Sequence, residues 1–447
     1  MNEAANEERR LAIEDGKVSA NGIPLIDVIA DGCWGKRSYK KNYSSLSGAA
    51  AIIGKRTGKI LFMAVKNKYC CICAQAAKKN ITPKEHECYK NYTGSSTGME
   101  STILVEGFKN SIKMHNLIYA RLISDGDANT YAKLLQSRPY KNITIEKIEC
   151  RNHLLRNLCN KLQALSTDTK YLIKYRKYIT KQRILSIRKV IVTAIRNYKN
   201  SGNVTSLHND IMLAADHAFG IHTTCKAFFC SKVGEDENID RDIFTNSLWH
   251  RIKFVLTHIA AHSRSLIEDV DSNIVERYHS IVAKFVGGKR VNFSQKYQYN
   301  MRCNAAALSF NTHKPLSLLQ KAIIGRSPTN ELKKFEVRKL KRLQRAKKYH
   351  RIKKRLYDHN TESSKNYGDQ CSKPDMSDEM LEESKKIFLN NLAETTKNRN
   401  QIERNTILQS GSSEWLELRR QILTASNFGR VIKRRNDNWS IQDIQGI

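Results

Sequence analysis

Short apolar runs alternate with helical segments between residues 25 and 165, and this alternation constrains the fold more than any other feature. The order is three strands, a helix, a strand, a helix, a strand and a helix. The predicted strands cover residues 25–30, 47–54, 59–66, 117–123 and 143–148, and the predicted helices cover 99–114, 128–136 and 150–165. Strands that alternate with helices in one domain predict an α/β fold, with a mixed sheet covered by helices.

The rest of the chain is mostly helical or polar. Residues 166–270 carry helical spacing, with a wide apolar stripe in 183–198, and residues 273–285 are predicted to form a later helix. The predicted organisation is a polar N-terminal tail (1–22), a sheet core (23–165), a helical insertion (166–270), a returning helix region (271–312), a helical, basic and polar linker (313–405) and an incomplete last module (406–447).

The charge balance indicates a polyanionic partner. Lys and Arg total 77 against 43 Asp and Glu, which gives a net charge of +34. A charge of this size repels itself unless a polyanion is near, so nucleic acid is the expected partner, and self-association stays open.

No apolar run reaches about 18 residues, so no membrane-spanning helix is expected. Without a signal peptide, the 11 clustered cysteines favour a reducing compartment and metal ligation over disulfides.

Three acidic residues far apart in the sequence are candidates for one catalytic site. Asp31 and Asp125 each follow a predicted strand, and Glu276 lies at the start of a late helix. Two Mg²⁺ ions about 4 Å apart need hard oxygen ligands and clamp both oxygens of an in-line phosphoryl transfer. The alternatives are ordinary Asp-Gly turns for the two Asp residues and a capping box from Asn273 to Glu276.

Cysteine and histidine pairs predict up to two zinc sites. Cys70-x-x-Cys73 and His86-x-Cys88 form one set of four soft ligands, for which the alternative is a reduced loop without metal. The second predicted set combines two further pairs, and Cys230 is a substitute for its last member. These ligands are Cys150, His153, His222 and Cys225. The alternative is that these side chains are simply packed in the protein interior.

Basic segments are candidates for contact with DNA phosphates. Residues 333–355 are dominated by Lys and Arg, and the alternatives are a solvated helix or a nuclear import signal. The cations expected to contact DNA there are Lys341, Arg342, Arg345, Lys347 and Lys348. Lys289 and Arg290 follow Gly287-Gly288 and are expected to hold the strand beside Glu276, unless they form only a flexible turn.

Several motifs in order resemble one known family. They are Asp31-Gly-Cys-Trp-Gly-Lys-Arg, Gly94-Ser-Ser-Thr-Gly-Met-Glu, Asp125-Gly-Asp127, Cys150-Arg-Asn-His153 and the segment from Asn273 to Ser294. Over residues 23–312 the chain resembles the Mutator-like transposase domain of eukaryotic mobile-element proteins. The long segment that ends at Phe293-Ser294 is the most specific part of the resemblance.

The resemblance implies an RNase H-like fold with an Asp, Asp, Glu metal triad and a helical insertion before the Glu. Asp31 would be the first acid, Asp125 the second, with Asp127 as its alternative, and Glu276 the third. These acids would bind two Mg²⁺ ions, and a water and then a DNA 3′-hydroxyl would attack phosphodiesters. The resemblance also supports Cys150 and His153 as a motif that follows the second acid. The expected location is the nucleus.

Residues 406–435 are similar to the opening of YqaJ-like viral recombinases, which are nucleases of the restriction-endonuclease-like fold. The similarity rests on the segments around Trp415 and Asn427. The metal-binding acids of that family lie further on, so we expect a truncated module without nuclease chemistry; the alternative is an amphipathic helix. The sequence as a whole predicts a DNA strand-cleavage and strand-transfer enzyme. The alternatives are a non-catalytic DNA-binding protein derived from a mobile element and a repair or recombination nuclease without strand transfer.

Overall fold

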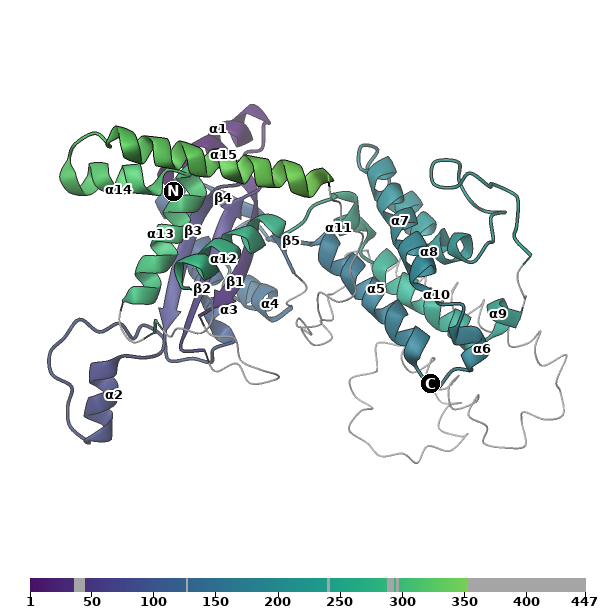
Figure 1. The fold of residues 1–447 in the computed structure, drawn as a ribbon, viewed down its shortest axis with the longest axis horizontal. Coiled ribbons are helices and arrows are strands. Elements are labelled where there is room, and N and C mark those ends of the chain that lie inside the picture. Colours follow the sequence, from purple (N-terminus) through teal and green to yellow (C-terminus); the bar gives the residue numbers. More distant parts are fainter. Residues whose placement is uncertain (36–44, 126–127, 239–241, 288–292, 295–296, 353–447) are drawn as a thin grey trace. The chain divides into compact units, whose positions relative to one another are not determined.

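The structure is a computed structural model that describes residues 1–35, 45–125, 128–238, 242–287, 293–294 and 297–352 (Figure 1). The described chain divides into two compact units, and each is considered by itself. The sheet unit comprises the described residues of 1–150 and 270–352, and the helical unit comprises those of 151–269. The helix that begins at Arg151 belongs to the helical unit, whereas the sequence analysis had assigned it to the sheet core.

The sheet unit contains a five-stranded mixed sheet of order β3-β2-β1-β4-β5. β1 pairs antiparallel with β2, and β2 pairs antiparallel with β3. β4 pairs parallel with both β1 and β5. The strands are β1 (Leu25–Trp34), β2 (Ser47–Gly54), β3 (Ile60–Asn67), β4 (Ile118–Ser124) and β5 (Glu146–Glu149). The predicted α/β class is therefore confirmed, and the mixed sheet is consistent with an RNase H-like fold.

β1 is longer than its apolar run predicts. The sequence suggested that the strand ends before Asp31, but pairing with β2 continues from Asp31, opposite Ala51, to Trp34, opposite Gly48. The reason is that β2 is buried along its whole length and places a paired residue opposite every residue of this stretch. Asp31 therefore lies within a strand and is not part of a turn.

Helices cover both faces of the sheet. One face packs in a hydrophobic core with α1 (Asn2–Glu14), α3 (Gly98–His115) and α4 (Ala128–Gln136). The other face packs in a second core with α12 (Asn273–Phe285) and α13 (Gln298–Thr312). The expectation of a polar tail is wrong for residues 2–14, because Ala4, Ala5 and Ala12 of α1 are buried in the first core.

Three further helices of the sheet unit lie outside these two layers. α2 (Cys71–Lys78) belongs to a long excursion between β3 and α3 (Figure 1). α14 (Pro315–Ile324) and α15 (Asn330–Ile352) form a helical hairpin. Glu336 of α15 is buried and accepts hydrogen bonds from the backbone N–H groups of Leu316 and Ser317, which caps the N-terminus of α14.

The helical unit packs its longer helices around an aliphatic core. α8 packs against α7 and α10, and α5 packs against α7 and α10. The core side chains follow helical spacing, as in Ile184, Ile187, Ile191 and Ile195 of α7. The helices are α5 (Arg151–Thr167), α6 (Ile173–Arg176), α7 (Lys181–Tyr198), α8 (Val204–Ala218), α9 (Asp242–Thr245), α10 (Ser247–Ala260) and α11 (Ser263–Ile267). Among the described residues, no helix has the length and apolar character needed to cross a membrane.

Candidate active site and metal centres

Asp31 lies on the face of the sheet that α12 covers. Ile29, two residues before it on β1, is buried in the core that α12 joins, and alternate strand residues share a face. The Asp31 carboxylate accepts a hydrogen bond from the backbone N–H of Gly32 at 2.8 Å. Its second oxygen is 3.5 Å from Nδ1 of His279, and the side chain keeps 25% exposure. The carboxylate is therefore fixed from one side and open to solvent from another.

The parallel register of β1 and β4 relates Asp31 to Asp125. Ile29 pairs with Ile123. Asp31 lies two residues after Ile29, and Asp125 lies two residues after Ile123. Asp125 directly follows the last residue of β4 and is half-buried. Asp31 and Asp125 therefore both follow the last β1–β4 pair, at the same end of the two parallel strands.

α12 crosses this end of the sheet and is held at two points. Near its beginning, the Ser272 N–H and hydroxyl donate to Sγ of Cys150, both at 3.3 Å, and the Cys150 N–H donates to the Ser124 carbonyl at 3.1 Å. Two turns later, His279 contacts Asp31. Glu276 lies one turn after the first contact and three residues before the second, on the His279 side of the helix. It therefore occupies the part of α12 between the end of β4 and Asp31.

The local structure does not support a capping box for Glu276. Ser272 is the N-cap residue of α12, and no side chain makes its capping hydrogen bond. A capping box needs its acid three residues after the N-cap, which is Val275 here. Val275 is fully buried in the core beneath the helix, whereas Glu276 is only half-buried. The position of Glu276 is therefore not explained by the start of the helix.

Two contacts of β1 close to Asp31 were not anticipated from the sequence, one on each face of the sheet. His279 lies within a motif that was recognised, but its contact with Asp31 depends on how α12 crosses the sheet. Glu100 of α3 approaches the opposite face of β1 at Gly32, where an added Cβ would lie 2.7 Å from its carboxylate. Gly32 is therefore needed for the close approach of Glu100, a role that the Asp-Gly turn interpretation missed.

An ion pair fixes the register on which this geometry depends. Asp27 of β1 accepts two hydrogen bonds from Arg121 of β4, from Nε at 2.8 Å and from Nη2 at 2.6 Å. Lys55 adds a third contact at 3.0 Å. Burial alone would raise the pKa of Asp27, but the two cations outweigh it and lower the pKa below its usual value.

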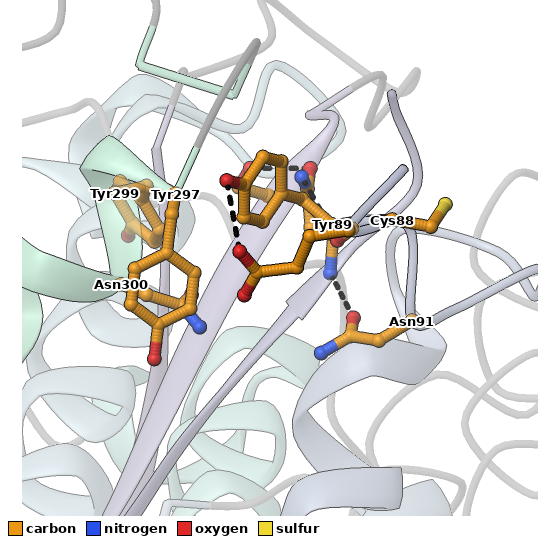
Figure 2. A pocket seen from close by; sticks show the side chains of 9 residues that line it. Cys88, Tyr89, Asn91, Tyr297, Tyr299 and Asn300 are labelled. Carbon is orange, nitrogen blue, oxygen red and sulfur yellow. Dashed lines mark hydrogen bonds between the residues drawn. The ribbon is translucent and has the colours of Figure 1, made fainter. Parts of the chain in front are cut away.

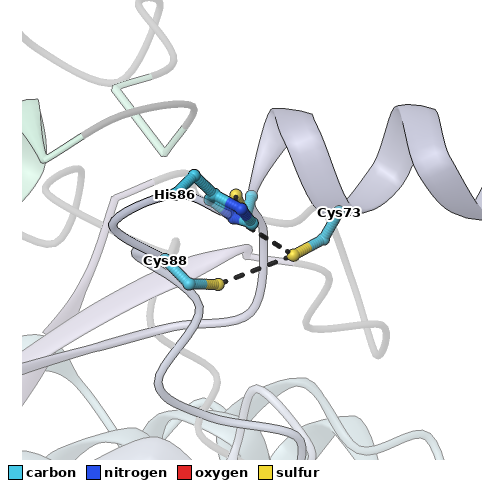
Figure 3. A group of neighbouring side chains, drawn as sticks. Cys73, His86 and Cys88 are labelled. Atoms are coloured by element: carbon cyan, nitrogen blue, oxygen red, sulfur yellow. Dashed lines mark hydrogen bonds between the residues drawn. The ribbon is translucent and has the colours of Figure 1, made fainter. Parts of the chain in front are cut away.

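The first predicted Cys/His set is brought together. Cys70, Cys73, His86 and Cys88 each offer a ligand atom, and these atoms all lie within 4.8 Å of one another (Figure 3). His86 Nε2 is 3.2 Å from Cys70 Sγ and 3.5 Å from Cys73 Sγ, and the sulfurs of Cys73 and Cys88 are 3.6 Å apart. Tetrahedral zinc separates a sulfur from a nitrogen by about 3.6 Å and two sulfurs by about 3.8 Å. The group therefore has the dimensions of a four-ligand metal site.

The surroundings of this group favour ligation. His86 Nδ1 donates to the Lys84 carbonyl at 2.7 Å, which leaves Nε2 to face the thiols, and this bond raises the pKa of His86 to about 9. Burial would raise the pKa of Cys70, but the N–H groups of Cys73 and Ile72 at the start of α2 lower it to about 6. A hydrogen bond with Cys88 raises the pKa of Cys73 to about 11. Cys70 is thus the thiol that ionises most readily.

The excursion that carries these ligands is anchored at Asn67, the last residue of β3. Asn67 accepts a hydrogen bond from Ser47, and its amide group donates to the carbonyls of Tyr69, Tyr89 and Ser294. Its backbone N–H donates to Asn91 at 2.6 Å. These groups lie at a small pocket next to Cys88, where the rings of Tyr89 and Tyr297 are 5.7 Å apart (Figure 2). Both ends of the excursion are therefore tied to the sheet.

The second Cys/His group differs from the predicted one. His217, His222, Cys225 and Cys230 of the helical unit lie with their ligand atoms within 4.8 Å of one another. Burial lowers the pKa of His217, which keeps its ring neutral, and burial together with Cys230 raises the pKa of Cys225 to about 12.

The predicted ligands Cys150 and His153 are not part of this group. Cys150 belongs to the sheet unit, where its thiol accepts the two bonds from Ser272, and His153 lies on α5. The short spacing of Cys150 and His153 suggested a shared site, but among the described residues neither belongs to a cluster of three or more potential metal ligands.

Comparison with known proteins decides the family. The family model of Mutator-like transposases matches residues 1–230, slightly more than half of the chain. The chain belongs to the Mutator-like transposase family. No curated protein and no solved structure matches it. Membership implies transposition-related processing of DNA, and hence DNA binding and a nuclease type of enzyme.

The match covers part of the candidate site of this Mutator-like transposase. Asp31, Asp125 and both Cys/His groups lie within residues 1–230, whereas Glu276 lies beyond them. The match also begins with α1, which agrees with the packing of that helix on the sheet. The C-terminal similarity to YqaJ-like recombinases has no counterpart in the comparisons, and residues 406–447 lie outside the described part of the chain.

The predicted basic contacts of the Mutator-like chain are described only in part. Lys341, Arg342 and Arg345 are exposed on α15, where Glu336 and Leu340 face inward instead. Asp127, Lys289 and Arg290 lie outside the described residues, as do the side chains of Lys347 and Lys348. The structure therefore shows that these three predicted cations are accessible to solvent.

Proposed function

We propose that this Mutator-like transposase cleaves DNA strands and joins a DNA 3′-hydroxyl to a target phosphodiester, with Asp31, Asp125 and Glu276 as its metal-binding acids. The observation that carries the proposal is the double attachment of α12, at Cys150 beside the end of β4 and at Asp31 of β1. A helix held at these two points would carry Glu276 toward the end of the sheet where both aspartates follow the last β1–β4 pair.

The donor set fits the proposed metal. Three carboxylates offer hard oxygen ligands, which suit Mg²⁺, and the half-buried positions of Asp125 and Glu276 leave room for water ligands. Two Mg²⁺ ions bound there would activate the attacking oxygen and stabilise the leaving oxygen of an in-line displacement. The chain's own residues supply positioning: His279 and the Gly32 N–H orient the two oxygens of Asp31. Asp127 stays the alternative to Asp125 as second acid.

Mg²⁺-dependent nicking and joining of supercoiled plasmid by the full chain test the triad. Asp31→Asn and Glu276→Gln should each lower cleavage at least about 100-fold, the cost of losing one preorganised group that stabilises transition-state charge. Asp15→Asn and Glu14→Gln are matched controls on the exposed end of α1 and should cleave like the parent. DNA binding should survive in all four variants.

The same assay separates the alternatives. Cleavage that persists in Asp31→Asn would refute the triad. DNA binding without cleavage by the parent would favour a non-catalytic DNA-binding protein of mobile-element descent. Cleavage without a joined product would favour a repair or recombination nuclease.

The remaining proposals concern the rest of the chain. Cys70, Cys73, His86 and Cys88 would hold a structural Zn²⁺, since four protein ligands leave no position for a substrate. Residues 406–435 would be the start of a YqaJ-like module without nuclease chemistry of its own. The cations of α15 would bind DNA phosphates, and the protein would act in the nucleus, where its substrate is found.

A further inference from the structure

The segment that follows α8 contains four potential ligands that the proposed transposition chemistry does not use. His217 lies in the last turn of α8, and His222, Cys225 and Cys230 follow within the next 13 residues. Residues 219–238 form neither helix nor strand. His222, Cys225 and Cys230 are nevertheless buried, with exposures of 5%, 8% and 6%. Irregular backbone that buries two thiols and an imidazole needs a specific stabilising interaction.

The distances within this group fit a tetrahedral ion. Cys225 Sγ is 3.5 Å from His217 Nδ1 and 3.6 Å from His222 Nδ1, and Cys230 Sγ is 3.4 Å from His222 Nδ1. Tetrahedral zinc with bonds of about 2.3 Å to sulfur and about 2.0–2.1 Å to nitrogen requires about 3.6 Å between such atoms. One Nδ1 atom near both sulfurs cannot satisfy both by hydrogen bonds alone, because a single ring nitrogen holds one proton at most.

The groups around the ligands are those of a closed metal site. The Lys232 N–H donates to Cys230 Sγ at 3.3 Å, which stabilises a thiolate. Glu237 lies 3.9 Å from Nε2 of His222, the ring nitrogen that faces away from the thiols. The rings of His217 and Phe229 pack at about a right angle, with their centroids 5.6 Å apart.

The backbone around the group is also held in place. Asp236 accepts from the N–H groups of His222 and Thr223, at 2.5 Å and 2.9 Å. The Gly234 N–H donates to the His222 carbonyl at 3.0 Å. The ligands therefore sit in a loop whose path is already fixed by hydrogen bonds.

We propose that His217, His222, Cys225 and Cys230 bind one structural Zn²⁺, which fastens the segment 219–238 to the C-terminal end of α8. The site is separate from the group at Cys70 and replaces the predicted set with Cys150 and His153. Its four protein ligands leave no open position, so it stabilises the helical unit and takes no part in strand cleavage.

The zinc content of the purified full chain, measured by mass spectrometry of the metal, tests the site. The parent should hold two zinc ions per chain, Cys230→Ser one, Cys73→Ser one and the double variant none. Cys159→Ser, a matched change of a buried cysteine on α5, should keep both, and so should Cys150→Ser. Two zinc ions retained in Cys230→Ser, or one lost in Cys150→Ser, would overturn the assignment.

A second set of measurements covers variants that fold poorly. His217→Cys keeps a ligand, so it should retain zinc, and its Co²⁺ form should show stronger sulfur-to-cobalt charge transfer than the parent. Chelation of zinc from the parent should open the segment to trypsin at the exposed Lys232. A Cys225–Cys230 disulfide in a zinc-free protein purified under reducing conditions would refute the proposal. Asp31→Asn should lose cleavage and keep both zinc ions. A parent protein that holds two zinc ions but does not cleave DNA would therefore count against the proposed function and not against this zinc site.

Discussion

Asp27→Asn should weaken the pairing of β1 with β4 and with it the alignment of Asp31 and Asp125. Asp27 holds Arg121 through two hydrogen bonds and Lys55 through a third contact, and its side chain is only 14% exposed. Its contact with Arg121 lies where the β1–β4 register shifts, between Ile26 and Asp27. The ion pair therefore holds the two strands in the register that makes the catalytic candidates neighbours.

The size of the effect follows from the exposure of the partners. Breaking a fully buried ion pair costs about 3–5 kcal/mol, and breaking an exposed one costs about 0–1 kcal/mol. Arg121 and Lys55 are 24% and 27% exposed, so this pair is intermediate. Asparagine keeps one acceptor oxygen for Arg121 but no charge. We expect a loss of about 2 kcal/mol in the free energy of unfolding of the sheet unit at pH 7.

The stability difference between the parent and Asp27→Asn should also depend on pH, in a direction that the pKa of Asp27 determines. Burial acts to raise the pKa of Asp27, and Arg121 and Lys55 lower it further than burial raises it. A carboxyl with a lowered folded-state pKa stabilises the fold above its unfolded pKa of about 3.9, and this stability is lost as the pH falls through the folded value. The difference between the parent and Asp27→Asn should therefore be full at pH 7 and should shrink below about pH 4.

Hydrogen exchange in urea, followed on peptides from β1 and β4, reports the sheet unit alone. Glu7→Gln is the control, because its exposed partner Arg10 lies on the surface of α1 and no measurable change is expected. An Asp27→Asn protein as stable as the parent at pH 7, or a difference that persists unchanged in acid, would refute the reasoning.

Two further predictions concern the surface of the sheet unit. Asn67→Leu removes five side-chain hydrogen bonds and should release the Cys-rich excursion, seen as trypsin cleavage near Lys78 and Lys84, while α5 stays protected; an unchanged cleavage pattern would contradict the anchoring role. Replacement of Lys341, Arg342 and Arg345 by Ala should lower the slope of log Kd against log salt by up to about 3, since each phosphate contact contributes about 0.9. The control removes three exposed lysines of the helical unit, Lys170, Lys174 and Lys181, and an equal loss of slope there would show that α15 has no special role.

Sequence periodicity predicted most of the regular structure, for a physical reason that also explains the failures. The bounds of α4 and α12 and the β2–β3 hairpin follow directly from apolar spacing, because each element buries one face. α1 was missed since its buried positions are three small alanines and Glu8, which contribute little to a hydropathy pattern although they recur at helical spacing. The end of β1 was missed because the partner strand, and not the local sequence, extends it.

The sequence identified candidate site residues more readily than it identified which of these residues lie together. The acids and the first Cys/His set were predicted from spacing and resemblance, and the structure brings the four ligands of that set together. The second set was mixed, because the four Cys and His residues from His217 to Cys230, counted with the pair at Cys150, allow several quartets. Only the fold decides among them, by bringing His217, His222, Cys225 and Cys230 together. The contact of His279 with Asp31 could not be predicted from the sequence, because it depends on how α12 packs on the sheet.

The position of the third acid in the chain raises a physical question, because the whole helical unit intervenes between β5 and α12. A long insertion adds little loop-closure cost if its two ends are already close together. The sheet unit meets this condition, since Cys150 and Ser272 are joined by two hydrogen bonds to one sulfur. The helical unit meets it too, since Arg151 pairs with Asp269. The chain therefore leaves the sheet unit and returns to it at adjacent points. The length of the helical insertion then has little effect on the position of α12 and Glu276 at the end of the sheet.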